Sequence, residues 1–212
     1  AASSGGLHRV DPVTMESHTY RHDPLNPGSL ADNVVRPLLE DSHGRLWVGT
    51  FNGLDLLDRR TGTFRHFPHT PGDPHSLSHD EVHYLLEDRR GILWVGTAGG
   101  LNRMTVAADG SATFERHTAS DGMADDAVAA ILEDERGDLW ISTNSGISRM
   151  DRKSGAWRNY RSGDGITEGA FFDGAALRAP DGTMYFGGFA GLTAFRPAAV
   201  RDNRIAPRAV IT

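Results

Sequence analysis

The chain has 212 residues, a formal net charge of −6 at pH 7, 10 histidines and no cysteine. The negative charge and the lack of a basic stripe argue against a general nucleic-acid-binding protein. Without cysteine the chain has neither disulfides nor cysteine-based zinc sites. No apolar run approaches the roughly 20 residues that span a bilayer, and the N-terminal residues lack the basic and apolar regions of a signal peptide.

One segment of the sequence recurs through the chain. It runs over residues 38–50 and returns nearly intact at 85–97 and 131–143, then in a worn form at 177–188. Its anchor aromatics are 47, 46 and 45 residues apart: Trp47, Trp94, Trp140 and Tyr185. A fixed period in this range indicates a repeat architecture.

Each repeat predicts four short strands. In the second copy, apolar segments rich in β-formers cover 81–87, 92–97, 100–104 and 112–117, and turn residues separate them. Four strands in about 46 residues, without helical periodicity, are typical of a β-propeller blade. The fold class predicted is therefore all-β, a β-propeller made of four-stranded blades.

In chain order the repeats divide residues 1–200 into about four and a half blades. We expect a partial blade at 1–20, which supplies only the third and fourth strands, then blades at about 33–67, 80–117 and 126–160, and a last blade at about 172–195. The chain begins within a repeat, so we expect a segment of a longer protein. It could form an open arc, close by pairing its ends, or complete a ring with another copy, because open sheet edges are otherwise prone to aggregation.

Two residue types of the repeat are predicted to be structural. The aspartates Asp41, Asp88 and Asp134 precede tight turns that contain a glycine three positions later, where an Asp side chain can accept backbone N–H groups. The aromatic residues Trp47, Trp94, Trp140 and Tyr185 are expected to pack between neighbouring blades.

The motif Leu-Glu-Asp-x-x-Gly-x-Leu-Trp-Val-Gly-Thr-x-x-Gly-Leu, near intact in three copies, resembles the two-component regulator propeller repeat. The resemblance implies a segment of a seven-bladed propeller in the periplasmic, extracytoplasmic part of a membrane-bound sensor histidine kinase, many of which respond to oligosaccharides. The worn copy resembles the last blade of such sensors. Residues 201–212 would then be a linker and the first strand of a following immunoglobulin-like domain.

Function is expected where the copies differ. At the start of the inner strand we align Asn33, Asp80, Asp126 and Phe171, and three positions later Arg36, His83, Ala129 and Gly174. Loops between the second and third strands also vary. Aromatic and amide side chains on one rim would suit a sugar. The candidate ligand-binding residues are Asn33, Arg36, Phe51, Asn52, Asp80, His83, Tyr84, Asp126, Asn144 and Phe189.

The function expected is a non-catalytic sensor segment that binds an oligosaccharide or other small ligand and self-associates. We expect no catalytic residue, cofactor or metal, since the histidines show no ligand-like spacing, and no partner among nucleic acids or membranes. One alternative is a propeller enzyme of the lyase or glycosidase kind, with His83 and Asp80 as the best pair. Three residues apart on a strand, however, they would face opposite sides. A second alternative is a repeat scaffold that assembles into a ring with another copy.

Overall fold

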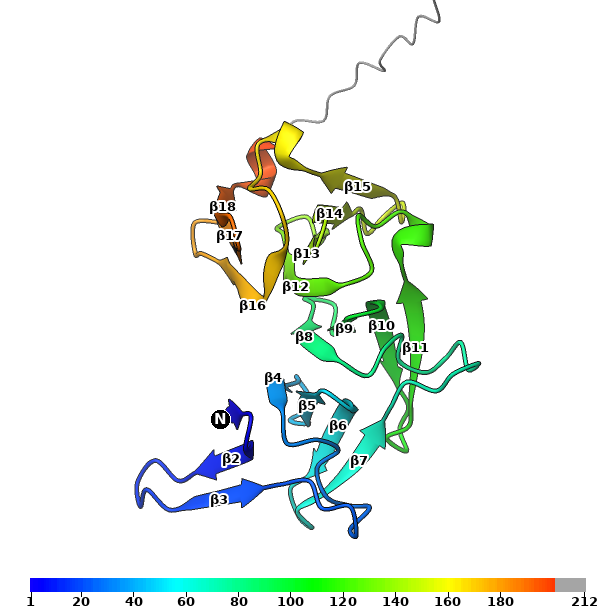
Figure 1. Ribbon diagram of the computed structural model, residues 1–212, viewed down its shortest axis with the longest axis vertical. Coiled ribbons are helices and arrows are strands. Elements are labelled where there is room, and N and C mark those ends of the chain that lie inside the picture. Colours follow the sequence, from blue (N-terminus) through cyan, green and yellow to red (C-terminus); the bar gives the residue numbers. More distant parts are fainter. Residues whose placement is uncertain (201–212) are drawn as a thin grey trace, which may run out of the picture.

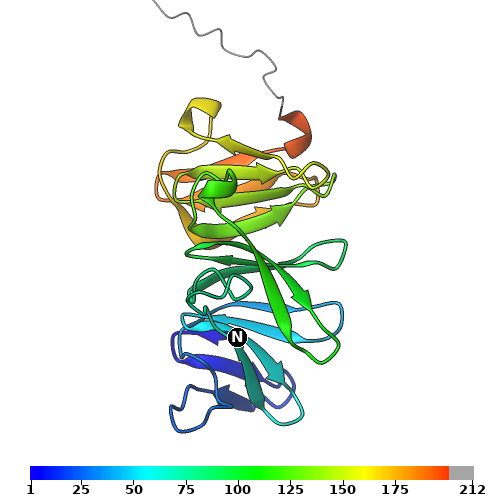
Figure 2. The same cartoon turned by 90° about the vertical axis from the view of Figure 1, so that its right-hand side faces the viewer.

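The computed structural model describes residues 1–200 and is all-β. Five antiparallel sheets follow one another along an open arc, from the N-terminal sheet to the sheet that contains β16–β18 (Figure 1). The second view places the sheets in a stack along the long axis of the molecule (Figure 2). The all-β propeller fold predicted from the repeats is confirmed, whereas the expected linker and strand at 201–212 lie outside the described residues.

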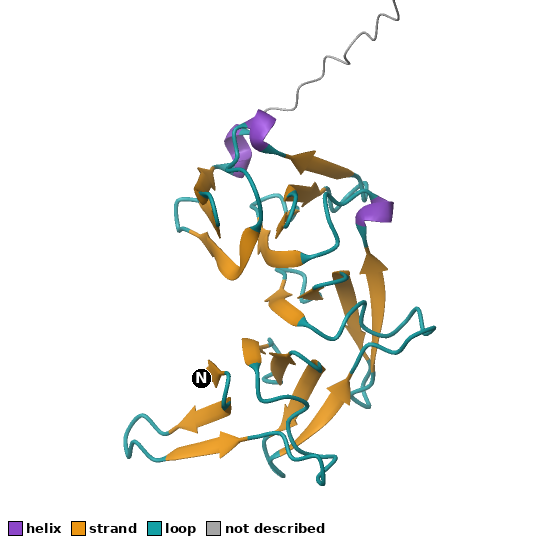
Figure 3. Ribbon diagram, in the orientation of Figure 1, coloured by secondary structure: helices purple, strands orange, loops and turns teal. Residues whose placement is uncertain are grey.

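Each complete sheet contains four strands in sequence order, and within residues 1–200 three short 3-10 helices interrupt the strands and loops (Figure 3). The first sheet contains β1 (Ala2–Ser3), β2 (Gly6–Val10) and β3 (Ser17–Tyr20). The second contains β4 (Val35–Glu40), β5 (Leu46–Thr50), β6 (Gly53–Asp58) and β7 (Thr63–Phe67). The third contains β8 (Val82–Glu87), β9 (Leu93–Thr97), β10 (Gly100–Val106) and β11 (Ala112–His117).

The fourth sheet contains β12 (Val128–Glu133), β13 (Leu139–Thr143), β14 (Gly146–Met150) and β15 (Trp157–Tyr160). The fifth contains β16 (Phe171–Arg178), β17 (Met184–Gly188) and β18 (Gly191–Phe195). The helices are η1 (Ala119–Asp121), η2 (Ser162–Asp164) and η3 (Pro197–Ala199). In the first sheet, β1 corresponds to part of the second strand of a complete sheet. This strand was not predicted from the sequence.

The turn between the first two strands of each complete sheet is held by its aspartate. Asp41 Oδ1 accepts the backbone N–H groups of His43 and Arg45, both at 3.0 Å, while Oδ2 accepts the indole N–H of Trp47 at 2.9 Å. Equivalent indole bonds of 3.0 Å join Trp94 to Asp88 and Trp140 to Asp134. Because a buried indole N–H needs an acceptor, the Asp of the repeat both shapes the turn and pairs the Trp.

The tryptophans pack in the cores between neighbouring sheets. Trp47 shares a core with Val82 and Phe114 of the third sheet, and Trp140 shares one with Phe186 of the fifth. Their exposures are 2 % or less, whereas Tyr185 in the fifth sheet is only half-buried. The anchor aromatic of a repeat is therefore fully buried in the three sheets that a following sheet covers, and only half-buried in the fifth.

The glycine that begins the third strand of every sheet has a steric reason. Gly53 and Gly146 have φ angles of +103° and +121°, which side-chain-bearing residues rarely adopt. A Cβ atom at Gly146 would lie 2.3 Å from the carbonyl oxygen of Tyr160. In the first four sheets this position is therefore glycine because the backbone of the next strand leaves no space for a side chain, whereas at Gly191 of the fifth sheet only the φ of +124° favours glycine.

Candidate functional site

The inner strands β4, β8, β12 and β16 line the concave side of the arc (Figure 1). Each has a β-bulge just after a buried apolar residue, which is Val35, Val82, Val128 or Phe171. Bulges redirect side chains out of the regular alternation of a strand. In the four strands the bulged segments are Arg36 with Pro37, His83, Ala129, and residues 172–175.

These bulges bring three charged or titratable side chains from three sheets into contact. Arg36 Nη1 forms an ion pair with Asp173 Oδ2. His83 Nδ1 lies 3.3 Å from Asp173 Oδ1 and donates to the carbonyl oxygen of Val128 at 3.1 Å. The opposite ring nitrogen, Nε2, lies 3.6 Å from a carboxylate oxygen of Glu81. We call Arg36, His83 and Asp173 the axial cluster.

The Arg36 guanidinium packs against the face of an aromatic ring. Its Cζ atom lies 4.4 Å from the centre of the Phe51 ring, a cation–π geometry. Phe51 belongs to the loop between β5 and β6, so this contact joins the inner strand to the rim of the second sheet. The ring restricts the orientation of the guanidinium while its N–H edges stay accessible.

A hollow of about 510 Å³ opens between the inner strands and includes the axial cluster. Its lining residues are Arg36, Pro37, Leu38, His83, Tyr84, Leu85, Asp173 and Gly174. Burial raises the pKa of the Tyr84 phenol, so this side chain stays neutral and can donate a hydrogen bond. The hollow therefore combines charged groups at its rim with apolar side chains of the inner strands.

Three of the candidate residues predicted from the sequence do not line the hollow. Their side chains form hydrogen bonds with the loops that connect neighbouring sheets. Asn33 Oδ1 accepts the backbone N–H of His22 at 2.9 Å, and Asp80 Oδ1 accepts that of His69 at 2.7 Å. Asp126 Oδ1 accepts the backbone N–H of Ala119 at 2.6 Å. At this shared position of the repeat, the side chain holds the connection from one sheet to the next. Asp80 is not paired with His83.

The remaining candidates lie on the rim loops. Asn52 is exposed and its Nδ2 donates to the carbonyl oxygen of Ala31 at 3.4 Å, while Asn144 is exposed on the loop between β13 and β14. Phe189 is 74 % exposed, and its ring centre lies 4.2 Å from that of Phe172, which is also exposed. The two rings form an exposed aromatic pair on the fifth sheet.

Asp173 and Phe172 were not among the residues predicted from the sequence, and the predicted alignment of the last copy was wrong. Phe171 pairs with Gly188 as Val35 pairs with Thr50, so Phe171 is equivalent to Val35 and not to Asn33. The next registered pair is Ala176 with Phe186, which leaves a wide bulge between them. An alignment made by counting residues from the anchor aromatic cannot detect such a bulge. The charged Asp173, followed by a glycine within an otherwise apolar segment, was the available signal.

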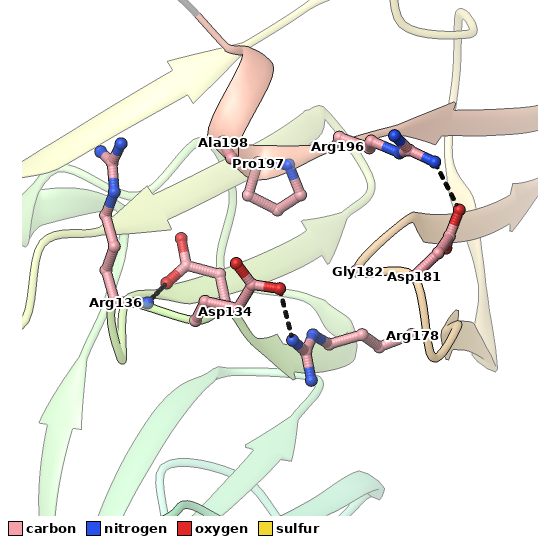
Figure 4. Close-up of a pocket in the computed structure, with 9 residues that line it drawn as sticks. Asp134, Arg136, Arg178, Asp181, Gly182, Arg196, Pro197 and Ala198 are labelled. Carbon is pink, nitrogen blue, oxygen red and sulfur yellow. Dashed lines mark hydrogen bonds and ion pairs between the residues drawn. The ribbon is translucent and has the colours of Figure 1, made fainter.

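A second, smaller hollow lies where the turns of the fourth and fifth sheets meet (Figure 4). It has a volume of about 70 Å³, and its charges are paired: Arg178 with Glu135 at 3.3 Å and Arg196 with Asp181 at 2.6 Å. Hydrogen bonds from Thr183 and Arg196 lower the pKa of Asp181 to about 2. Its small size and paired charges make it a less suitable ligand site than the axial hollow.

Residues 1–200 contain no group of three or more histidine or acidic side chains placed to hold a metal ion. None of the helices in this range has the length and apolar character needed to cross a membrane.

Comparisons with known proteins agree with the repeat pattern. The family described as two component regulator propeller matches residues 29–52, 76–99 and 122–145. Each match runs from the end of an inter-sheet loop through the inner strand to the rim loop. A search of curated proteins found no match.

Solved structures match nearly the whole chain. The extracellular domain of the hybrid two-component system BT3049 from B. thetaiotaomicron is 27 % identical, with a TM-score of 0.77 over 92 % of this chain and 25 % of that one. The extracellular domain of BT4673 from the same organism is 20 % identical, with a TM-score of 0.73 over 93 % and 28 %. This chain thus spans about a quarter of the length of these extracellular domains.

A third similar structure is an enzyme, virginiamycin B lyase from Staphylococcus aureus. It is 15 % identical, with a TM-score of 0.60 over 91 % of this chain and 63 % of that one. At this identity the likeness establishes a shared fold alone. Taken together, the comparisons show that three segments of the chain match the two component regulator propeller repeat and that the chain shares the β-propeller fold of these structures.

Proposed function

We propose that this chain is the ligand-binding part of an extracytoplasmic sensor propeller, located in the periplasm, and that its ligand binds in the axial hollow. The observation that carries the proposal is the axial cluster. Bulges in β4, β8 and β16 bring Arg36, His83 and Asp173 together, although none of the three belongs to the repeat motif. Residues that leave the repeat pattern and meet at one place indicate selection for something other than the scaffold.

The comparison with BT3049 supports the sensor role, because that protein's 27 % identical domain is the extracellular part of a hybrid two-component system. A sensor ectodomain transmits the binding of its ligand and does not need to convert the ligand chemically. The chain is accordingly proposed to be non-catalytic.

The ligand class proposed is an oligosaccharide. A sugar presents apolar C–H faces and hydroxyl groups, which suit aromatic rings beside amide and charged side chains. The rim offers the exposed pair of Phe172 and Phe189 together with Asn52 and Asn144. The axial hollow, at about 510 Å³, lies in the size range of small-molecule sites.

Isothermal titration calorimetry with a panel of oligosaccharides tests the proposal. We expect at least one glycan to bind, and Arg36→Ala to weaken that binding at least tenfold. Arg103→Ala is the matched control, because Arg103 is exposed on β10 and pairs with Glu115 far from the inner strands. Binding to no glycan, or equal loss in both variants, would contradict the proposal.

The non-catalytic role has its own test, since propellers of the same fold include a lyase. The purified chain should turn over neither lactones nor glycosides. Turnover by the wild-type chain that disappears in His83→Ala would make the protein an enzyme. The catalytic pair would then be His83 with Asp173, and not the pair of His83 with Asp80 predicted from the sequence.

Self-association is proposed as a second property, and exposed apolar residues of the fifth sheet support it. Leu192 is 61 % and Leu177 62 % exposed, whereas Leu54 and Leu101, which share the repeat position of Leu192, are fully buried beneath a following sheet. Light scattering at several concentrations should detect a dimer or larger ring. Leu192→Glu should shift it to monomer; a concentration-independent monomer in the wild type would refute self-association.

A further inference from the structure

Resting on the proposed function, we infer that the ligand of the axial hollow carries a carboxylate, and that this carboxylate takes the place which the Asp173 side chain occupies in the structure. The ligand class is a uronic-acid oligosaccharide, an acidic sugar whose carboxylate is recognised by Arg36 and His83.

The carboxylate of Asp173 lies between two basic side chains, Arg36 and His83. Asp173 Oδ2 pairs with Arg36 Nη1, and Asp173 Oδ1 lies 3.3 Å from His83 Nδ1. Basic side chains from two different sheets thus flank the two oxygens of one carboxylate: Arg36 Nη1 donates a hydrogen bond to Oδ2, and His83 lies at ion-pair distance from Oδ1 while its Nδ1–H also serves the Val128 carbonyl oxygen. A carboxylate on a ligand can reproduce both contacts.

The second argument is that the donors are held in place independently of Asp173. His83 is only 9 % exposed, and its Nδ1 is anchored on the carbonyl oxygen of Val128. Arg36 rests on the Phe51 ring at 4.4 Å. Guanidinium groups bind carboxylates through two parallel hydrogen bonds, so a freely approaching carboxylate can use more of the Arg36 fork than the tethered Asp173 does.

The third argument is that Asp173 is held weakly. It lies in the wide bulge of β16, and Phe172, Asp173 and Gly174 are all exposed. Gly174 has a φ of +73°, and a Cβ atom there would meet nothing within 4 Å. The ion pair with Arg36 is about one-third exposed on both sides, at 35 %, and exposed ion pairs contribute little to stability. A ligand can therefore displace Asp173 without disrupting packed structure.

The fourth argument concerns the sugar ring. Phe172 lies next to Asp173 in the chain, and its ring contacts that of Phe189. The two rings do not line the hollow itself, so we infer that the apolar face of a further pyranose ring of the same oligosaccharide packs against them.

The test compares acidic sugars with neutral sugars of the same shape. Trimers of galacturonate, glucuronate and mannuronate, and the methyl esters of each, are titrated by calorimetry into the wild-type chain at low salt. At least one free acid should bind at least tenfold more tightly than its ester. Added salt should weaken the binding of the acid more than the binding of the ester.

Variants separate recognition from competition. Arg36→Ala should weaken binding of the acid at least tenfold and leave the ester unchanged, while Asp173→Asn should strengthen binding of the acid severalfold because the internal competitor is removed. Arg103→Ala and Asp109→Asn are the matched controls on exposed sites away from the hollow. If Arg36→Ala does not fold, Arg36→Lys keeps the charge, removes the fork and should still weaken the acid.

The outcomes distinguish this inference from the proposed function. Equal binding of acid and ester, or weaker acid binding in Asp173→Asn, overturns the inference. If uronates fail to bind while a neutral oligosaccharide binds and depends on Arg36, the carboxylate inference is wrong but the proposed function stands. If neither class binds, both are wrong.

Discussion

Arg152 and Asp88 are 64 residues apart and form a buried ion pair between neighbouring sheets, with 2.7 Å from Nη1 to Oδ2. The Arg152 guanidinium also lies over the Trp94 ring, 4.6 Å from Cζ to its centre. Burial alone would raise the pKa of Asp88, but hydrogen bonds from Trp94, Ile92 and Arg152 outweigh it and lower this pKa. One arginine of the fourth sheet thus completes the Asp–Trp pair of the third.

Removal of this arginine should be costly. Arg152→Ala leaves the Asp88 carboxylate buried with one charged partner fewer, and loss of one member of a buried pair costs about 3 kcal/mol or more. Urea unfolding followed by tryptophan fluorescence measures it. The control Arg103→Ala breaks an exposed pair and should cost less than about 1 kcal/mol. Similar costs for the two variants would contradict the buried role of Arg152.

The turn aspartates should differ in importance between the third and fourth copies of the repeat. Asp134→Ala leaves the buried indole N–H of Trp140 without its acceptor, which costs about 1–3 kcal/mol. Asp181 occupies the same turn in the last copy but is exposed, and Tyr185 stands where the other copies have Trp. Asp181→Ala should therefore be nearly neutral. Equal midpoints in urea for Asp134→Ala and wild type would refute the role of the Asp–Trp bond.

Stability should fall as the pH rises above neutrality, because of one pair in the second sheet. His66 Nδ1 lies 2.6 Å from Asp55 Oδ1, and Nε2 donates to the Pro27 carbonyl at 2.9 Å. The bond to Asp55 raises the pKa of His66 above 6.5, and burial raises the pKa of Asp55. The folded chain therefore binds protons more tightly than the unfolded chain, so this stabilisation is full below pH 6.5 and is lost as the pH passes the raised pKa of His66.

Melting temperatures between pH 5.5 and 9 measure this dependence. The next sheet has Asn102 and Arg116 at the same registered positions, so the double variant Asp55→Asn with His66→Arg supplies a matched, non-titrating copy. Its melting temperature should fall less between pH 6.5 and 9 than that of the wild type. Parallel profiles would show that the pair does not carry the dependence.

Equivalent leucines should contribute unequally to stability. Leu101→Ala empties a fully buried position between sheets and should cost about 2–5 kcal/mol. Leu192→Ala changes the same repeat position on the exposed fifth sheet and should stay within about 0.5 kcal/mol at concentrations low enough for the chain to be monomeric. A large cost at Leu192 would mean that another sheet covers this face in solution, so the comparison also checks the proposed self-association.

Much of the scaffold could be read from the repeated residues. The period of 45 to 47 residues between anchor aromatics predicted the sheets, and the Asp-x-x-Gly turn predicted that the Asp side chain accepts backbone N–H groups. The indole bond to the same Asp was not predicted, although Trp47 follows Asp41 by six residues, as Trp94 follows Asp88. Such features are local and repeat in each copy, so spacing alone exposes them.

The candidate site was only partly predictable. Arg36 and His83 were found because they break the pattern, and the structure joins them. Asn33, Asp80 and Asp126 were chosen as polar residues at the start of the inner strand, yet their side chains hold the loops between sheets. A sequence comparison registers that a polar residue recurs, but not whether its partner is a backbone N–H of the same chain.

The local sequence therefore determined the strands, the turns and the buried aromatic anchors, because each depends on residues within one repeat of about 46. The pairing of Arg36 with Asp173 across 137 residues depends instead on how far the arc bends and on the wide bulge in β16. Bulge register and curvature arise from the packing of whole sheets on one another. Only the tertiary structure could therefore place these charges together.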